Sequence, residues 1–192
     1  MTSMALFRRF YRQLLRPWAW GLIALTLGLQ LFFMARIAAM SVFNPSSTAF
    51  ERSEMVRLMP SNAPWRWQQQ WVDLKDISVH LQRAVIVSED DLFMQHQGVH
   101  WDALEKAWQR NEKSMAMAQK GGRAAHLVGG STITQQLAKN LFLSGERTLI
   151  RKGQEMSLTF MLEGALSKRR ILEIYLNHVE WGQGVFGAQA AA

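Results

Sequence analysis

Three consecutive acidic residues, Glu89-Asp90-Asp91, are the first group in this sequence that could do chemistry. They follow an apolar stretch, residues 85–87, which would bring Glu89 to the edge of a core. A carboxylate that is partly removed from water is a better general base than a solvated one, so Glu89 is a candidate for that role. Acidic residues at a helix end are more often simply solvated, and the pattern taken alone favours this simpler interpretation.

A polar helix with a glycine-rich start is the second such group. Ser131, which follows Gly129 and Gly130, is predicted to cap a helix over residues 132–143. One face of this helix is polar, with Thr132, Gln135, Gln136, Lys139 and Asn140, and the opposite face is apolar, with Ile133, Leu137 and Leu141. Backbone N–H groups at its start suit an anion, and Lys139 adds a positive charge. An ordinary amphipathic helix would show the same spacing.

A second candidate carboxylate, Glu155, stands in a basic setting beside Arg151 and Lys152. Arg151 and Glu155 are four residues apart, which on a helix gives an ordinary ion pair worth about 0.2–0.5 kcal/mol. The functional alternative is a cationic clamp for phosphate with a carboxylate beside it. Two separated glutamates together with several cationic groups suit the transfer of a sugar away from a phosphate leaving group.

A helical framework is needed to position these groups. The spacing of apolar residues predicts helices over 101–111, 132–143, 148–166 and 168–177, with Ser78 and Ser167 as further N-caps. The polar segment 111–130 is predicted to be the most mobile loop, and Glu173 and Asn177 of the last helix could face the site. Gly182, Gly184 and Gly187 predict a tight turn near the end. Few stretches alternate as strands do, so the predicted fold class is mainly α.

The N-terminal residues predict a membrane anchor. Residues 18–35 carry no charge and would span roughly 27 Å as a helix at about 1.5 Å per residue. Arginines precede this stretch at Arg8, Arg9, Arg12 and Arg16. The positive-inside rule then keeps the N-terminus in the cytoplasm and places the remaining chain outside. A cleaved signal peptide is the alternative, but the apolar stretch is longer than the usual 7–15 residues or so.

The predicted organisation is therefore a basic tail (1–16), a transmembrane anchor (17–40), a linker (41–66) and a catalytic domain (67–192). The linker carries turn signals and a short predicted helix near residues 49–58. The aromatic residues Trp65, Trp67 and Trp71 follow, and they would either sit at the membrane interface or pack on the domain.

Composition narrows the possible chemistry. The chain of 192 residues has no cysteine, which excludes disulfides, thiolate metal sites and a cysteine nucleophile. The formal net charge of +7 favours anionic partners such as phosphate-bearing substrates or anionic lipid. Part of this charge belongs to the anchor, and no nucleic-acid-binding motif occurs, so nucleic acid is not an expected partner.

In their order along the chain, these segments resemble the family-51 glycosyltransferases, specifically the monofunctional biosynthetic peptidoglycan transglycosylases. The matching segments are Glu89-Asp90 with Phe93, His96 and Gly98, then 129–140, then Arg151-Lys152 with Glu155, and finally 170–177. The resemblance covers residues 71–192 together with the layout of the anchor. It implies a mainly α, lysozyme-like glycosyltransferase domain behind one transmembrane helix.

The resemblance also implies roles for individual residues. Glu89 matches the general base that deprotonates the acceptor sugar 4-hydroxyl, which attacks the donor anomeric carbon with inversion. Glu155 matches a second essential carboxylate, which acts at the pyrophosphate either directly or through a divalent cation, Mg²⁺ or Mn²⁺. Groups near the pyrophosphate are Lys139, Arg151 and Lys152. Substrate-contacting or site-shaping positions are Ser131, Thr132, Gln135, Gln136 and Asn140, and the supporting positions are Asp90, Phe93 and His96.

By the same resemblance the substrates are lipid II and a glycan linked to undecaprenyl pyrophosphate. The protein is expected in the bacterial inner membrane with its catalytic domain on the outer face, and cell-division or cell-wall synthesis proteins are candidate partners. The chain has His100 where the family usually has aspartate, and the family domain is expected to continue beyond Ala192. A lysozyme-like hydrolase that cuts glycan and a non-catalytic cell-wall scaffold are the alternative functions.

Overall fold

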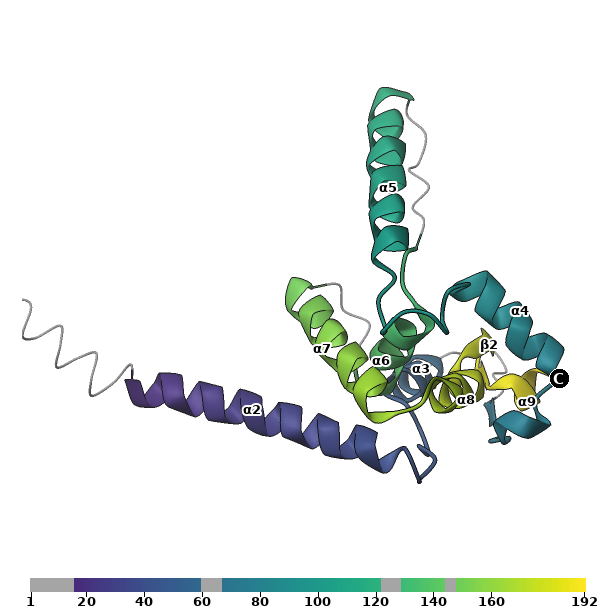
Figure 1. Ribbon diagram of the computed structural model, residues 1–192, viewed down its shortest axis with the longest axis horizontal. Coiled ribbons are helices and arrows are strands. Elements are labelled where there is room, and N and C mark those ends of the chain that lie inside the picture. The colour runs from purple at the N-terminus through teal and green to yellow at the C-terminus, as the bar shows by residue number, and fades with distance from the viewer. Residues whose placement is uncertain (1–15, 60–66, 122–128, 144–147) are drawn as a thin grey trace, which may run out of the picture.

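The computed structural model of the chain describes residues 16–59, 67–121, 129–143 and 148–192, and this part is mainly helical, as predicted (Figure 1). Its helices are α2 (Arg16–Ala39), α3 (Ala49–Leu58), η2 (Leu74–Asp76), α4 (Val79–Glu89), α5 (Trp101–Gly121), α6 (Ile133–Phe142), α7 (Leu149–Ala165), α8 (Lys168–His178) and α9 (Ala188–Ala191). Its strands are β1 (Gln68–Gln69), β2 (Glu180–Gly182) and β3 (Val185–Phe186).

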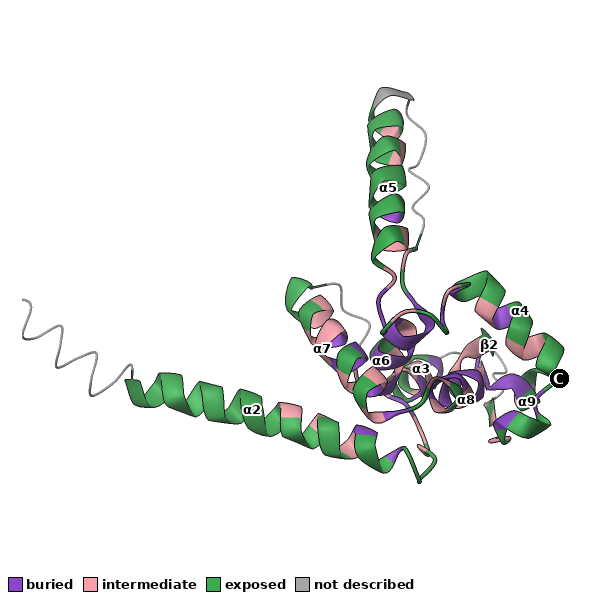
Figure 2. Ribbon diagram, in the orientation of Figure 1, coloured by how far each residue is buried: buried purple, intermediate pink, exposed green. Residues whose placement is uncertain are grey.

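The core is built around α6, which packs against α3, α7 and α8. The predicted apolar face is confirmed, because Ile133, Leu137 and Leu141 are all buried. Leu158 of α7 and Ile174 of α8 are fully buried in the same cluster. Figure 2 shows the buried residues concentrated at this junction, whereas α2 and α5 are mostly exposed. Each buried side chain of this size stabilises the fold by about 1.5–3 kcal/mol, so α6 is the element that the others depend on.

The N-cap of α6 differs from the predicted one. Thr132, and not Ser131, caps the helix: its hydroxyl accepts from the Gln135 backbone N–H, and the Gln135 side chain accepts from the Thr132 backbone N–H. This reciprocal pair needs a glutamine three residues after the cap, which Thr132 has and Ser131 lacks. Ser167 caps α8 as predicted, whereas Ser78 precedes α4 without making a side-chain cap.

Helix α5 corrects the predicted loop over 111–130. The helix continues to Gly121, so residues 111–121 are helical, while residues 122–128 lie outside the described part of the chain. Glutamate, lysine, alanine, methionine and glutamine dominate the added stretch, and all of these favour helix even where no core is available. The predicted loop is therefore wrong for residues 111–121, because a polar composition does not by itself exclude a helix. The helix projects away from the body of the molecule (Figure 1).

Helix α2 coincides with the predicted anchor and is long and apolar enough to span a membrane. Its C-terminal end packs into the domain, because Ile37 and Met40 are buried in the main core. Gln30, a polar residue within the apolar stretch, exchanges side-chain amide hydrogen bonds with Gln154 of α7, at 2.9 and 3.3 Å. The anchor is thus joined to the catalytic domain by packing as well as by the chain.

Part of the predicted linker is also a packed element. Helix α3 forms where a short helix was predicted and lies against α6. Thr48 caps it with Glu51, and the other Glu51 carboxylate oxygen lies 2.7 Å from His178 Nδ1. His178 Nε2 in turn lies 3.2 Å from the Pro45 carbonyl oxygen. Glu51 and His178 are both buried, so this pair fastens α3 to the end of α8.

A small sheet that the sequence did not predict closes the end of the domain, with strand order β1-β3-β2. The predicted turn is the reversal between β2 and β3. Trp67 packs on Phe186 with ring centroids 4.8 Å apart, and Trp71 lies 5.9 Å from the His178 ring. These two tryptophans therefore pack on the domain, and Trp65 lies outside the described residues.

The buried pair between Glu51 and His178 predicts a stability effect. In Glu51→Ala, His178 loses its buried carboxylate and the Thr48 backbone N–H loses its acceptor. We expect the free energy of unfolding to fall by about 3–5 kcal/mol, measured by denaturation in detergent. Glu54→Ala on the same helix is the control, because the partner of Glu54 is the exposed Arg57. Equal losses in both variants would contradict the role given to the buried pair.

Candidate functional site

A pocket with a cavity volume of about 240 Å³ lies at the end of α4. Its walls are residues 87–91 of the α4 end, residues 129–132 before α6, and His100, Ala103, Lys106, Ala107 and Arg110 at α5. Four predicted site residues meet here, namely Glu89, Asp90, Ser131 and Thr132. The first two predicted motifs, which are separate segments of the chain, thus form one cavity with carboxylates on one side and cations on another.

Glu89 is the last residue of α4 and is exposed in this pocket. One carboxylate oxygen, Oε2, accepts a hydrogen bond of 2.9 Å from the Gln136 side-chain amide. The desolvation expected from the apolar lead-in is absent, because the core ends at Val85 and the helix then runs out to the open pocket. Any advantage of Glu89 as a base must come from its position beside a bound substrate.

Asp90, in contrast, is buried and holds the two motifs together. Its Oδ1 lies 2.7 Å from His96 Nε2, and its Oδ2 accepts from the Ile133 backbone N–H at 3.0 Å. His96 Nδ1 accepts from the Gly98 backbone N–H at 3.1 Å, so Nε2 carries the proton that is donated to Asp90. A negative charge at the N-terminus of α6 is also favourable to the helix dipole. Asp90 and His96 thus hold the loop that follows α4 against the start of α6.

Thr132 and Gln135 hold the start of α6 in place next to the pocket. Besides capping α6, the Thr132 hydroxyl donates to the Gly98 carbonyl at 2.6 Å. Gln135 is 1% exposed, with its Oε1 in the cap and its Nε2 without a partner among the described residues. The resemblance left open whether these positions contact substrate or shape the site, and the geometry favours shaping.

Gly98 is required by the packing beneath the pocket. Its φ of 85° favours glycine, and an added Cβ would lie 2.7 Å from Thr159 Cγ2 and 2.9 Å from Glu163 Cγ. Both of those neighbours belong to α7, so the loop that follows Glu89 rests directly on α7.

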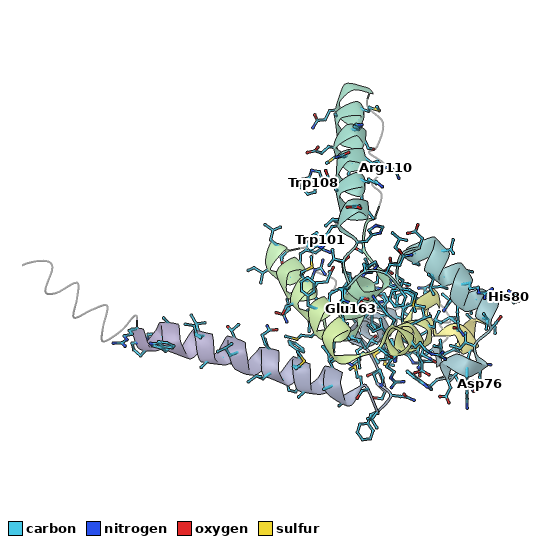
Figure 3. The ribbon with its side chains drawn as sticks, in the orientation of Figure 1. Asp76, His80, Trp101, Trp108, Arg110 and Glu163 are labelled. Carbon is cyan, nitrogen blue, oxygen red and sulfur yellow. The ribbon has the colours of Figure 1, made fainter. Side chains whose placement is uncertain are left out.

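A buried charged cluster that sequence reasoning missed supports the same loop. The Glu163 carboxylate accepts from Thr134 at 2.5 Å and from Lys168 at 2.8 Å. The Lys168 ammonium also lies 4.5 Å from the centroid of the Phe93 ring, which is fully buried. Figure 3 shows Glu163 in the middle of the molecule. The partners come from three different helices, so no spacing in the sequence indicates this cluster.

The third predicted motif forms a separate cationic cluster on α7. Arg151 Nη1 donates to Glu155 Oε2 at 2.9 Å, and Lys152 donates to the other oxygen. The Glu155 side chain is only 4% exposed, so this is a buried ion pair and not a surface helix pair. Two cations share one carboxylate, which leaves a positive excess, and Arg151 Nε has no partner among the described residues. The cluster does not line the pocket at Glu89.

The remaining predicted contacts lie on α6. Lys139 is exposed, and no hydrogen bond or ion pair joins its side chain to another residue in the described ranges. Asn140 is half-buried beside it. A lysine that forms no ion pair on an otherwise packed helix is available to bind an anion.

Two cations at the pocket were not predicted. Lys106 and Arg110 are four residues apart on α5, so they share the face that lines the cavity. Figure 3 shows Arg110 and Trp108 on opposite sides of this helix. The spacing was visible in the sequence, but charged residues on an exposed helix are normally solvated. His100, the departure from the family pattern, also lines the pocket and stacks on the His96 ring at 5.9 Å.

Two residues of α8 that were expected to face the site do not. Glu173 accepts from the Leu74 backbone N–H at 2.8 Å, and Asn177 binds both the N–H and the carbonyl of Val72. They therefore fasten the segment before α4 to α8.

The divalent cation that the resemblance left open does not fit the donor set at Glu155. Both carboxylate oxygens already accept from Arg151 and Lys152. Within the described ranges there is no group of three or more histidine or acidic side chains that could hold a metal ion. The chemistry considered for this site therefore includes no step at a metal ion.

Comparisons with known proteins relate this chain to one family. A family model described as Transglycosylase matches residues 55–192. A protein named biosynthetic peptidoglycan transglycosylase from Herminiimonas arsenicoxydans is 52% identical over 170 residues, covering 88% of this chain and 70% of that protein. One of the same name from Ralstonia nicotianae is 54% identical over 166 residues, covering 85% and 67%. Another from a Janthinobacterium species is 51% identical over 170 residues, covering 88% and 70%.

The packing at Gly98 predicts opposite effects for two glycine substitutions. Gly98→Ala forces a side chain into α7 at a positive φ, so we expect the free energy of unfolding to fall by at least about 1–3 kcal/mol. Gly153→Ala, inside α7 with no atom within 4 Å of its added Cβ, should instead raise it by about 0.5–1 kcal/mol. Chemical denaturation of both variants checks this, and the same sign of change in both would contradict it.

Proposed function

The chain belongs to the peptidoglycan transglycosylase family of glycosyltransferases, and from this premise we propose that its reaction is the polymerisation of lipid II into glycan strands. The observation that carries the proposal is the position of Glu89 in the pocket, with one carboxylate oxygen held by Gln136 and cationic side chains, Lys106 and Arg110, lining the same cavity. A single carboxylate with one oxygen free is suited to accept a proton from a sugar hydroxyl.

In the proposed step, the 4-hydroxyl oxygen of lipid II forms a bond to the anomeric carbon of the growing strand. Glu89 takes the hydroxyl proton as the bond between the anomeric carbon and the pyrophosphate oxygen breaks. The bonding electrons leave with undecaprenyl pyrophosphate. Attack from the side opposite the leaving group inverts the configuration at the anomeric carbon. Direct displacement needs one base for the attacking hydroxyl, and that role is given to Glu89, whereas the neighbouring Asp90 is already bound to His96 and to the Ile133 backbone N–H.

Cationic side chains have to stabilise the negative charge on the departing pyrophosphate. Lys139 is exposed without an ion pair, and the cluster of Arg151, Lys152 and Glu155 carries a positive excess. We assign these groups to the donor pyrophosphate. The buried Glu155 then serves to hold Arg151 and Lys152 in a fixed orientation, because a buried carboxylate requires both partners.

The proposal also includes an orientation in the membrane. Helix α2 fits a single-pass anchor, and the arginines that precede it support an N-terminus in the cytoplasm. The pocket would then lie on the outer face, where the pyrophosphate of a lipid-linked sugar is within reach of a domain packed directly on its anchor.

Replacing the proposed base should remove activity and leave the fold intact. Glu89→Gln keeps the size and the contact with Gln136 but cannot take a proton, so we expect lipid II polymerisation to fall by about 10²- to 10⁴-fold. Turnover of fluorescent lipid II by the purified protein in detergent measures this, with thermal unfolding as the fold control. Asp76→Asn, at an exposed acid far from the pocket (Figure 3), is the matched variant that should keep full turnover.

Near-normal polymerisation by Glu89→Gln would overturn the assignment of the base. Product analysis also separates the proposal from a lytic enzyme, because a lysozyme-like hydrolase would shorten finished glycan and leave lipid II unused. Release of sugars from finished glycan without polymerisation would therefore replace the proposed function with that one.

The proposed pyrophosphate contacts predict different effects for two cations. Lys139→Met should lower turnover by at least about tenfold with no change in melting temperature, because Lys139 forms no ion pair in the described part of the chain. Arg151→Met should lower both, since it also leaves Glu155 with one partner fewer. Arg83→Met on α4 is the control for loss of an exposed positive charge. Unchanged turnover in Lys139→Met and Arg151→Met would leave the clamp without support.

A further inference from the structure

A chain of side-chain hydrogen bonds leads from the core to Glu89. The Tyr175 hydroxyl of α8 donates to Gln136 Oε1 at 3.0 Å, and Gln136 Nε2 donates to Glu89 Oε2 at 2.9 Å. Gln136 is thus the link between a buried tyrosine and an exposed carboxylate. It is the side-chain partner of Glu89 within the described ranges.

Chemistry determines the direction of both bonds. A carboxylate only accepts hydrogen bonds, so the amide nitrogen of Gln136 has to face Glu89. The amide oxygen then faces away, and a hydroxyl can meet it only as a donor. Without the tyrosine oxygen the amide loses the donor that holds its own oxygen, so its orientation depends on the contact with Glu89 itself and on a long contact of 3.5 Å from Gln136 Nε2 to the Ser131 carbonyl.

Tyr175 is suited to act as a fixed donor. It is 2% exposed, and its neighbours Ile174 and Leu176 are fully buried, so the ring is held by the core. Burial, and secondly the negative charge of Glu89, raise the pKa of Tyr175 above its ordinary value of 10.0. The hydroxyl therefore keeps its proton over the whole range in which a carboxylate base works.

We propose that Tyr175, acting through Gln136, is a positioning residue that holds one oxygen of Glu89 and leaves the other directed to the acceptor hydroxyl. A neutral amide fixes the base without the strong stabilisation that a lysine or arginine partner would give the carboxylate. The inference rests on the proposed function, since it assigns a role relative to that base. Tyr175 is 2% exposed and is not among the residues that line the pocket, so its proposed action on Glu89 passes through Gln136.

Other charged groups around Glu89 are common to all variants compared below. Asp90 and Asp91 adjoin it in the chain, and His100, Lys106 and Arg110 line the same pocket from the α5 side. Because these groups stay in place, a difference in pH dependence between two variants reports on the chain through Gln136.

The test is Tyr175→Phe, which removes one oxygen from a buried ring and keeps its packing. We expect kcat for lipid II polymerisation to fall by about tenfold, the size expected for one hydrogen bond, with KM unchanged. Loss of the ordered donor at Gln136 disfavours the charged form of Glu89. The acidic limb of the rate–pH profile should therefore move to higher pH, by up to about one unit.

Two further variants separate positioning from a general loss of stability. Gln82→Leu removes a structural amide of α4 that binds the Leu74 and Ile77 carbonyls, and it should lower the melting temperature without moving the acidic limb. Gln136→Met removes the link itself. Tyr175→Phe should add no further loss of kcat to Gln136→Met, because its effect passes only through that amide.

The outcomes distinguish this inference from the proposed function. If the unmodified protein does not polymerise lipid II, or Glu89→Gln retains turnover, the proposed function fails. If both of those results are as expected but Tyr175→Phe matches the unmodified protein in kcat and in its pH profile, the positioning role alone is overturned. Additive losses of kcat in the double variant of Tyr175→Phe and Gln136→Met would overturn the positioning role as well.

Discussion

The contact between the Asp90 carboxylate and the first backbone N–H of α6 is the interaction on which the site depends. One aspartate oxygen satisfies the Ile133 N–H, which no helix can satisfy from within, and the other is held by His96. Thr132 adds a second connection to the same loop through the Gly98 carbonyl. These bonds place Glu89, the neighbour of Asp90, within reach of Gln136 on the first turn of α6. Glu89, on an exposed helix end, is thereby held by a buried junction.

Buried and exposed polar residues have different roles in the region around the pocket. Residues with buried polar groups, such as Asp90, Gln135 and Glu163, hold elements together, while exposed residues such as Glu89 and Lys139 remain free for a ligand. Glu155 combines both situations, because it is buried and yet paired with two cations on the first turns of α7. Burying a charged group without a partner costs folding free energy. Each buried charged side chain therefore requires its partners to stay in place.

The anchor belongs to this framework. Ile37 of α2 and Met40, which follows the helix, are buried in the same core as α6, and Arg170 of α8 donates to the Met40 and Phe43 carbonyls. Gln30 and Gln154 join the anchor to the helix that carries Arg151 and Glu155. The position of the cationic cluster relative to α2 is therefore determined by packing. A flexible linker between anchor and domain would leave that position variable.

Local signals in the sequence determined the helices, the anchor and the types of residue that form the site. Apolar spacing located α6, α7 and α8, because this feature depends on neighbours within one or two helical turns, while the resemblance proposed Glu89 and Glu155 as site residues. Tertiary structure alone decided the remainder. Whether Glu89 is exposed, which cations of α5 reach the pocket, and that Tyr175 stands behind Gln136 all depend on contacts between residues that lie on different elements and far apart in the chain. A helical pattern specifies which face is apolar but not which other helix covers it, so such contacts have no local signature in the sequence.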